Sequence, residues 1–280
     1  MSKSTGSETR GSDWSPDQYL LFADARNRPI HDLIAFLSPE YSPSSIIDLG
    51  CGPGNSTELL AKRFPNAKIS GVDSSPAMLA RARTALPNID FTQADLRWYE
   101  PPPGVDLLFS NAVFHWLRQD ERIFHITRLL RTLKPGGILA LQMPDNYHEG
   151  SHRAMRDMMK TSSLALHFKD LPREERPWID ETEEPIEYYN ALMPHCRAVE
   201  TWTTRYVHVL DAYEDIVEWV KGTGLQPYLN LLPDERLRDT FLKEYKARLR
   251  REYARAQDGK VLLAYPRRFV VAYSAGGAVR

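Results

Sequence analysis

Cysteine is scarce in this sequence: Cys51 and Cys196 are the only two in 280 residues. Two thiols exclude a disulfide framework and a cysteine-rich zinc site, and we expect no metal centre. Neither thiol has an evident activating base beside it, so we assign chemistry to neither.

The chain also lacks an excess of charge of one sign. Its 36 Lys and Arg face 37 Asp and Glu, which gives a formal net charge of −1. This balance offers no electrostatic reason to expect nucleic acid or an acidic membrane surface as a partner. No apolar run approaches the roughly 20 residues of a membrane span, and residues 1–12 lack the apolar segment of a secretory signal. We therefore expect a soluble cytoplasmic protein, either a monomer or a weak homo-oligomer.

Apolar runs alternate with helical patterns through the first half of the chain. Short buried strands are predicted at 45–49, 68–72, 89–92, 105–110 and 138–142. Helices are predicted at 29–37, 57–64, 76–86 and about 120–132, with Asn55 or Ser56 capping the second of them. Strands that alternate with helices form parallel βαβ units. The predicted fold is therefore α/β, a Rossmann-like doubly wound sheet.

The pattern changes after Pro144. The expected elements are helical patches within 145–195, a strand at 199–209, helices at about 211–222 and 233–256, and a bent or paired terminal strand around Pro266. The basic stretch Lys243–Arg255 is read as a solvated helix face. We expect a disordered tail at 1–12 and one domain at 13–280. Its segments at about 13–40, 145–195 and 211–256 are expected to form a helical cap.

Three glycines at alternate positions, Gly50, Gly52 and Gly54, follow the first predicted strand. They let the backbone turn sharply and approach a ligand closely, at the edge where open α/β sheets bind ligands. The alternative is a purely structural turn. The spacing fits the dinucleotide pattern GxGxxG poorly, and the acid at Asp48 would repel a pyrophosphate. Asp48 is placed either to hold a cationic amino group or to organise the loop as an N–H acceptor, and both roles can coexist.

Two further acids end the next two strands. Asp73 lies 19 residues after Gly54, close to the roughly 20-residue spacing of an acid that binds a ribose diol. Asp95 ends the third strand, where a carboxylate can accept from an adenine amine. Each acid alone is also explained as a helix cap. Together they favour one ligand that contains a cation, a ribose and a base.

The segments DLGCGPG, GVDSSPAML, QADL, DLLFSNAVFHW and LKPGGILALQMP resemble, in order and spacing, the motifs of class I S-adenosylmethionine-dependent methyltransferases. From Trp14 to Tyr273 the chain is similar to members that esterify small polycarboxylic acids, trans-aconitate among them, through segments such as WSPDQYLLFADARNRP, DIVEWVKGTGLQPYL and LLAYPRRFVVA. The resemblance implies a seven-stranded sheet whose last strand is antiparallel, with a helical cap. It also implies methyl ester formation on a small anionic carboxylate substrate.

The same resemblance implies a set of residues for S-adenosylmethionine and its product S-adenosylhomocysteine. Asp48 would support the amino group, Asp73 the ribose and Asp95 the adenine amine. The full implied set is Asp48, Gly50, Gly52, Gly54, Asp73, Ser74, Met78, Asp95, Leu96, Asn111 and Ala112.

A carboxylate acceptor is ionised at pH 7 and needs no general base, so the protein has to align the reactants and clamp the remaining carboxylates. Arginine forks suit that task. The candidate acceptor-binding residues are Tyr19, Arg26, Arg28, His115, Trp178, Tyr228, Arg267 and Arg268. At most one of Arg267 and Arg268 is expected to face the site, because neighbours on a strand point to opposite faces.

His115 and Trp116 are candidate positioning residues at the point of methyl transfer, and ordinary packing is the alternative for both. A carbon, nitrogen or hydroxyl acceptor is the alternative reaction, with His115 as the base. A nicotinamide-dependent oxidoreductase is disfavoured by the glycine spacing and by Asp48. A noncatalytic cofactor-binding protein that presents its cap to a partner remains a further class.

Overall fold

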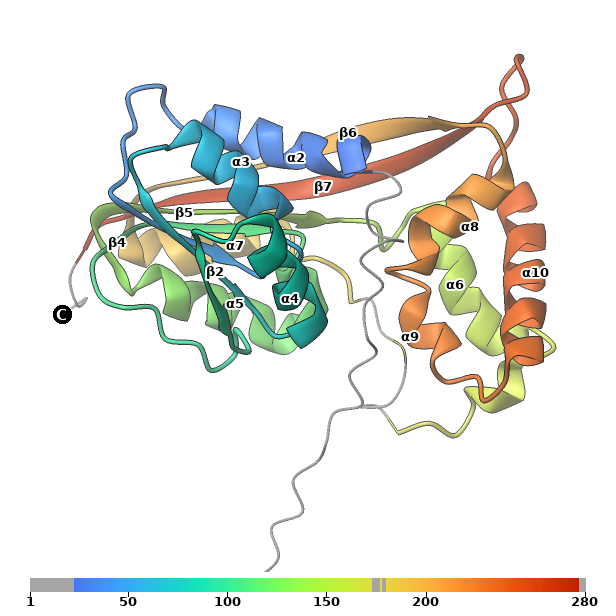
Figure 1. The fold of residues 1–280 in the computed structure, drawn as a ribbon. Coiled ribbons are helices and arrows are strands. Elements are labelled where there is room, and N and C mark those ends of the chain that lie inside the picture. The colour runs from blue at the N-terminus through green and yellow to red at the C-terminus, as the bar shows by residue number, and fades with distance from the viewer. Residues whose placement is uncertain (1–22, 173–176, 178–179, 277–280) are drawn as a thin grey trace, which may run out of the picture.

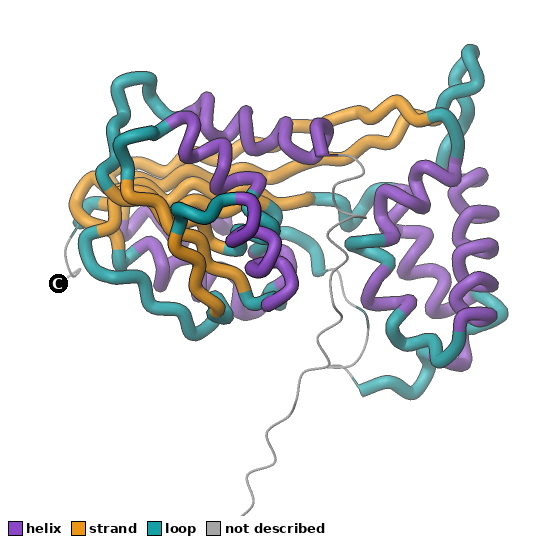
Figure 2. The backbone as a smooth tube through the Cα atoms, in the orientation of Figure 1, coloured by secondary structure: helices purple, strands orange, loops and turns teal. Residues whose placement is uncertain are grey.

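The computed structural model describes residues 23–172, 177 and 180–276 of the chain (Figure 1). The predicted tail at 1–12 lies outside this part. The described elements fall into a sheet flanked by helices and a separate group of helices beside it (Figure 2).

Seven strands form one sheet in the order β3-β2-β1-β4-β5-β7-β6. Their bounds are β1 Ser45–Leu49, β2 Lys68–Asp73, β3 Asp90–Gln93, β4 Val105–Asn111, β5 Leu133–Pro144, β6 Cys196–Leu210 and β7 Val261–Ser274. Strands β1 to β5 pair in parallel, whereas β7 is antiparallel to both β5 and β6. The doubly wound α/β sheet and its antiparallel last strand are confirmed.

The longer helices are α2 Ala23–Phe36, α3 Asn55–Arg63, α4 Pro76–Ala85, α5 Gln119–Leu130, α6 Gly150–Thr161, α7 Pro185–Leu192, α8 Tyr213–Lys221, α9 Gln226–Leu229 and α10 Glu235–Glu252. Helices α2 and α3 pack on one face of the sheet, and α5 and α7 pack on the other. Both faces are apolar and covered, as a parallel sheet requires. Within the described ranges, no helix has both the length and the apolar character needed to cross a membrane.

The cap differs in composition from the sequence expectation. Helix α2, within the expected cap segment 13–40, buries Leu33 and Ile34 against sheet residues that include Phe109. Helix α7, within the segment 145–195, buries Tyr188 against the opposite face of the sheet. Each of these two helices has an apolar face, and each covers part of one face of the sheet. The helices beside the sheet are therefore α6, α8, α9 and α10.

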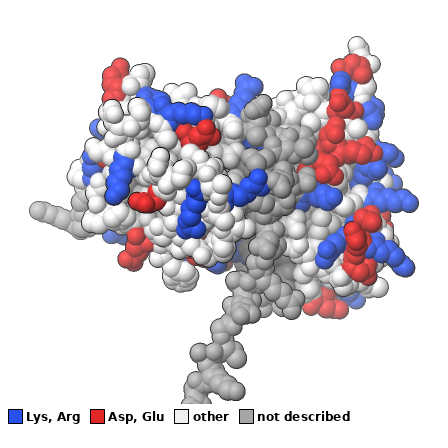
Figure 3. All heavy atoms as spheres, in the orientation of Figure 1, with Lys and Arg blue, Asp and Glu red and all other residues white. Residues whose placement is uncertain are grey.

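These four helices enclose a second hydrophobic core. Trp219, Tyr228, Phe241 and Tyr245 are its largest fully buried side chains. The outer face of α10 is charged, and Figure 3 shows acidic and basic side chains interspersed over this part of the surface. Lys246 pairs with Glu214 of α8 at 2.9 Å. The solvated face predicted for Lys243–Arg255 is confirmed.

A two-stranded ribbon connects the two cores. The pairing of β5 with β7 ends at Pro144 and Arg267, but β6 and β7 stay paired as far as Leu210 and Val261 (Figure 1). Of the two readings of the terminal strand around Pro266, bent or paired, the pairing is confirmed: β7 is continuous through Pro266 and pairs with both β5 and β6. The Pro266 carbonyl accepts from the Asp145 N–H at 2.9 Å, on the β5 side. Its nitrogen faces the same way, so the missing N–H removes no bond from the ladder with β6.

Candidate active site

The loop after β1 is shaped by its three glycines. Gly50, Gly52 and Gly54 have φ of +71°, +54° and +100°. A Cβ on Gly50 would lie 2.2 Å from a methyl of Val113, whereas a Cβ on Gly52 would meet nothing within 4 Å. The loop therefore packs tightly against Val113 at Gly50, whereas the space beside the Cα of Gly52 is free. Gly54 caps α3, so the expectation of Asn55 or Ser56 as the cap is wrong.

Asp48 is fully buried beneath this loop. Its Oδ2 accepts from the hydroxyls of Ser56 at 2.7 Å and Thr57 at 2.6 Å, which explains why Ser56 does not cap the helix. Its Oδ1 has no hydrogen-bond partner among the described residues. Burial raises the pKa of Asp48 to about 6, and the two hydroxyl hydrogen bonds partly oppose this rise. One buried carboxylate oxygen is thus left for a ligand, while the other organises the start of α3.

Asp73 joins the ends of β1 and β2. Its Oδ2 accepts from the Gly52 N–H at 2.9 Å and its Oδ1 from the Ser75 N–H at 2.8 Å. Burial raises the pKa of Asp73. Ser75 caps α4, which places the buried side chain of Met78 in its first turn, and Ser74 is exposed beside it.

Asp95 follows β3 at the same edge of the sheet, but it has a cationic partner. The guanidinium of Arg97 donates to both carboxylate oxygens, with Nη2 to Oδ2 at 2.6 Å and Nε to Oδ1 at 3.0 Å. These bonds lower the pKa of Asp95. The neighbouring Leu96 is buried. The carboxylate stays ionised and keeps lone pairs for a further donor.

A row of polar side chains continues from β4 towards β7. The Gln142 amide donates to Oδ1 of Asn111, and its Oε1 accepts from Nη1 of Arg267 at 3.4 Å. Asn111 and Gln142 are register partners on β4 and β5. Ala112, directly after Asn111, holds a strained φ of +58°. Gln142 is missing from the sequence-based set, because nothing in its own strand distinguishes it from a polar residue at a strand end.

Arg267 and Arg268 do point to opposite faces of the sheet. Arg267 shares the face of Phe269, under α2, and is 6% exposed. Arg268 points to the face of α5 and α7, where its Nη2 pairs with Asp145 at 2.9 Å. Arg268 therefore forms a structural ion pair with Asp145. Of the two neighbouring arginines, Arg267 is the one that lies beside the polar row.

The two arginines of α2 have different surroundings. Arg26 is 6% exposed and donates from Nη2 to the Trp219 carbonyl of α8 at 2.6 Å, so it joins α2 to the cap. Arg28 is exposed and lies over the ring of Tyr206 at 5.7 Å. The structure thus brings Arg26 to the boundary between sheet and cap and leaves Arg28 at the surface.

His115 and Trp116 lie in a short turn after β4, with ring centroids 4.6 Å apart. Burial, together with the nearby positive charge of Arg267, lowers the pKa of His115 well below its usual value. His115 is therefore neutral at pH 7. Its Nδ1 is buried and has no hydrogen-bond partner in the described part of the chain.

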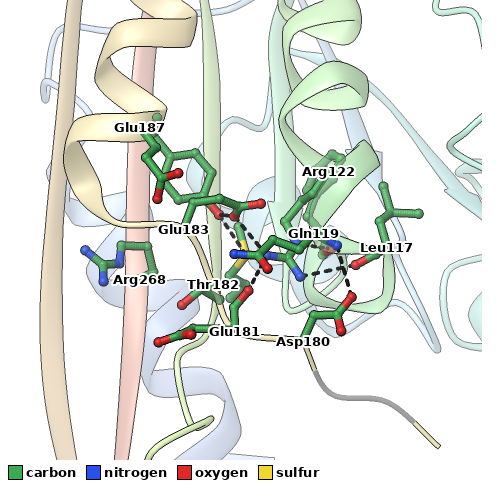
Figure 4. A network of polar contacts seen from close by, with 12 residues as sticks. Leu117, Gln119, Arg122, Asp180, Glu181, Thr182, Glu183, Glu187 and Arg268 are labelled. Carbon is green, nitrogen blue, oxygen red and sulfur yellow. Dashed lines mark hydrogen bonds and ion pairs between the residues drawn. The ribbon is translucent and has the colours of Figure 1, made fainter. Parts of the chain in front are cut away.

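A buried arginine fixes this turn (Figure 4). Arg122 of α5 is fully buried, and it donates to the carbonyls of Phe114 at 3.0 Å and Leu117 at 3.2 Å. Its Nη1 pairs with Glu183 at 2.8 Å, and Glu183 also accepts from the Tyr188 hydroxyl. Arg122 thereby ties the His115 turn to the segment before α7. Arg122 was not among the residues predicted from the sequence, because an arginine within an amphipathic helix gives no local sign of burial.

The remaining candidates lie in the cap or outside the described residues. Tyr228 of α9 is fully buried, and its hydroxyl has no partner among the described residues. Tyr19 and Trp178 lie outside the described part of the chain. His152 of α6 was not predicted, yet it is 4% exposed and near enough to Arg267 for that charge to contribute to lowering its pKa to about 3.

These residues fit S-adenosylmethionine in type and place. The unpartnered Asp48 oxygen suits a cationic amino group, and the open side of Gly52 beside Asp73 suits a ribose. The sheet order, with acids after its first three strands, is that of a class I S-adenosylmethionine-dependent methyltransferase.

Comparisons with known proteins agree with this class. A family model described as a methyltransferase domain matches residues 46–137. Among solved structures, the YcgJ protein of Bacillus subtilis superposes with a TM-score of 0.54 at 14% identity, covering 88% of this chain and all of that one. A Haemonchus contortus phosphoethanolamine N-methyltransferase in complex with S-adenosylhomocysteine gives a TM-score of 0.52 at 16% identity, over 87% of this chain and 52% of that one. At these identities the two structures show the fold.

Relatives with similar sequences show which family within this class the chain belongs to. A trans-aconitate 2-methyltransferase of Rhodopseudomonas palustris strain BisB18 is 45% identical over 263 residues, covering 93% of this chain and 99% of the relative. One from Methylobacterium nodulans is 46% identical over 262 residues, covering 93% and 98%. The chain belongs to the trans-aconitate 2-methyltransferase family of S-adenosylmethionine-dependent enzymes.

Proposed function

We propose that this protein transfers a methyl group from S-adenosylmethionine to a carboxylate oxygen of trans-aconitate or a closely related polycarboxylate. The observation that carries the proposal is the buried guanidinium of Arg267, at the end of the polar row through Asn111 and Gln142. A small polyanion can be buried beside a sulfonium only if its other carboxylates meet cations. The net charge of −1 supplies no global attraction, so the positive potential has to be local.

The residues of the glycine loop and strand ends would hold the methyl donor, which supplies an electrophilic methyl on a positively charged sulfur. Asp48 would pair with its amino group through Oδ1, and Asp73 would accept from the ribose hydroxyls. Asp95 would accept from the adenine amine. Gly50, Gly52, Gly54, Ser74, Met78, Leu96, Asn111 and Ala112 would complete the surroundings.

The chemical step depends more on the alignment of the carboxylate with the methyl group than on acid–base catalysis. A carboxylate oxygen forms its bond to the methyl carbon as the sulfur–carbon bond breaks, and the opposite charges cancel as it does so. Holding the reactants in line and excluding water then supply most of the acceleration. His115 and Trp116 would line the point of transfer. Because the surroundings lower the pKa of His115 well below its usual value, it is a weak base, which disfavours an acceptor that must lose a proton.

Transfer of a radiolabelled methyl group tests this proposal. The purified protein is incubated with labelled S-adenosylmethionine and, separately, trans-aconitate, a phenol and an amine. We expect label only in trans-aconitate and expect mild alkali to release it as methanol, as for a methyl ester. Alkali-stable label in the phenol or the amine would overturn the carboxylate assignment. A cytoplasmic location and a monomeric or weakly oligomeric state remain predictions.

A further inference from the structure

The cap and the loop that leads into it from β5 contain three polar groups that have no partners among the described residues. The hydroxyl of Tyr228 on α9 is one, and the buried Nη1 of Arg156 on α6 is another. The third is the side-chain amide of Asn146, which is 3% exposed and has both polar atoms unsatisfied. Buried polar groups are normally hydrogen-bonded in native proteins. These three groups are therefore available to hydrogen-bond to a polar ligand.

The orientation of Arg156 suits an anion. Its guanidinium carbon lies 3.7 Å from the ring centroid of Tyr147, so a face of the guanidinium stacks on the ring. A stacked guanidinium keeps its N–H donors in its own plane, where they match the two oxygens of a carboxylate. No Asp or Glu among the described residues forms an ion pair with Arg156.

Arg156 is near the other groups of the candidate site. It lies four residues after His152 on α6, so the two share a helix face. The charges of Arg156 and Arg267 both contribute to the low pKa of His152, and the charge of Arg156 also reaches Tyr228. The His152 ring lies 6.1 Å from that of Tyr265, two positions before Arg267 on β7. His152 thus lies between a cation of the cap and a cation of the sheet.

We propose that Arg156, with the Tyr228 hydroxyl and the Asn146 amide, forms a cap subsite for one carboxylate of the acceptor that is not methylated. The inference rests on the function proposed above and deepens it. A tricarboxylate has two carboxylates left when the third reacts. Arg267 on the sheet receives one of them and Arg156 on the cap the other, so the acceptor spans the boundary between the two cores.

The test compares acceptors that differ by one carboxylate. Itaconate and mesaconate each correspond to aconitate with one carboxylate removed. For Arg156→Met we expect kcat/KM with trans-aconitate to fall by about 30-fold or more, the scale of a broken buried charge pair. With the dicarboxylate that lacks the carboxylate bound at this subsite, the fall should stay within about threefold. A structural defect would instead lower the activity on all three acids together.

The matched control is Arg153→Met on the same helix. Arg153 is half exposed and pairs with Glu252, so all three acids should keep their wild-type kcat/KM within about threefold. If Arg156→Met does not fold, the same comparison of acceptors is made with Tyr228→Phe, which removes only one hydroxyl from the proposed subsite. A loss selective for the tricarboxylate supports the subsite, and unchanged selectivity overturns it.

Calorimetry with tricarballylate, a saturated tricarboxylate, gives a readout without turnover in the presence of S-adenosylhomocysteine. We expect binding to the wild type and at least tenfold weaker binding to Arg156→Met, with unchanged affinity for S-adenosylhomocysteine. Equal tricarballylate affinity in the two proteins would overturn the cap subsite alone. A wild type that neither binds tricarballylate nor methylates trans-aconitate would overturn the proposed function itself.

Discussion

The N–H of Gly52 donates to Oδ2 of Asp73 at 2.9 Å, so the loop after β1 is held by the acid that ends β2. The other oxygen of Asp73 accepts from the Ser75 N–H at the start of α4. One carboxylate therefore sets the relative position of two loops and is also the group that we propose to bind the ribose. On this proposal, the shape of the loop and the binding of the ribose depend on the same carboxylate.

Replacing Asp73 should therefore affect the cofactor more than the fold. For Asp73→Ala we expect S-adenosylmethionine to bind about 10- to 100-fold more weakly, because hydrogen bonds to a charged group contribute about 1.5–3 kcal/mol. Calorimetry measures this. The control is Asp90→Ala, which changes an exposed acid at the start of the neighbouring edge strand β3. An unchanged dissociation constant would remove Asp73 from the site.

Asp48 should limit the stability of the unliganded protein at neutral pH. Burial raises its pKa from an ordinary 3.8 to about 6. Between these values the folded state binds more protons than the unfolded state, so the free energy of unfolding decreases as pH rises. Asp48→Asn should therefore be more stable than the wild type above pH 6, by up to about 3 kcal/mol.

This gain should shrink as the pH falls from 6 towards 4, because Asp48 of the folded protein takes up its proton over this range and the unfolded state does so only near its ordinary pKa of 3.8. Urea unfolding at several pH values measures it, and a gain that is independent of pH would contradict the assignment. The same variant should bind S-adenosylmethionine more weakly, because it loses the anion that we propose to pair with the amino group.

His152 should give the opposite pH dependence. Its pKa in the folded protein is lowered to about 3, mainly by burial. Below about pH 6.5 the His152 imidazole takes up a proton in the unfolded state but stays neutral in the folded state. His152 therefore lowers the free energy of unfolding as the pH falls. His152→Gln should flatten the loss of stability between pH 6.5 and 4 in urea unfolding. Equal slopes in the two proteins would show that His152 is not buried in its neutral form.

Methyl transfer to a carboxylate should survive the loss of His115. For His115→Gln we expect kcat with trans-aconitate to stay within about tenfold of the wild type, since the nucleophile is already ionised. A loss beyond about 100-fold, the scale of general acid–base catalysis, would point to an acceptor that needs a base. Cofactor affinity measured on the same variant separates chemistry from binding.

The four arginines predicted from the sequence should separate into three behaviours. Arg267→Ala and Arg26→Ala should lower kcat/KM for trans-aconitate by about 30-fold or more, as expected for lost buried cations. Exposed Arg28→Ala should change it by less than about threefold. Arg268→Ala should mainly lower the melting temperature, because it leaves Asp145 without its partner. Loss of activity in Arg28→Ala alone would place the clamp elsewhere.

The sheet, and the loops that we propose to hold the cofactor, were predictable because their signals are local. The glycines and Asp48 lie within seven consecutive residues, and each strand of the first half carries its own apolar run. Even the unexpected partners of Asp48, Ser56 and Thr57, lie eight and nine residues away. Hydroxyls in the first helical turn after a buried acid were a readable signal.

The proposed acceptor end was less predictable because its contacts join distant segments. Arg122 and Glu183 are 61 residues apart, and neither sits in a motif. Arg156 lies over Tyr147, and its charge reaches Tyr228, only once α6, the loop before it and α9 are packed together. The one local sign was the spacing of His152 and Arg156 on a single helix face. The burial of α2 and α7 on the sheet likewise depended on which face was left uncovered.

Strand β7 contributes side chains to both hydrophobic cores and so connects them. Leu263 and Tyr265 are held in the core of the cap, whereas Phe269 and Val271 are held in the core of the sheet. Arg267 lies between these two anchored stretches. A rotation of the cap relative to the sheet has to twist the β6–β7 ribbon in this interval, and it would turn the Arg267 guanidinium with it. The angle of the cap therefore sets the direction of the guanidinium that we propose to bind an acceptor carboxylate.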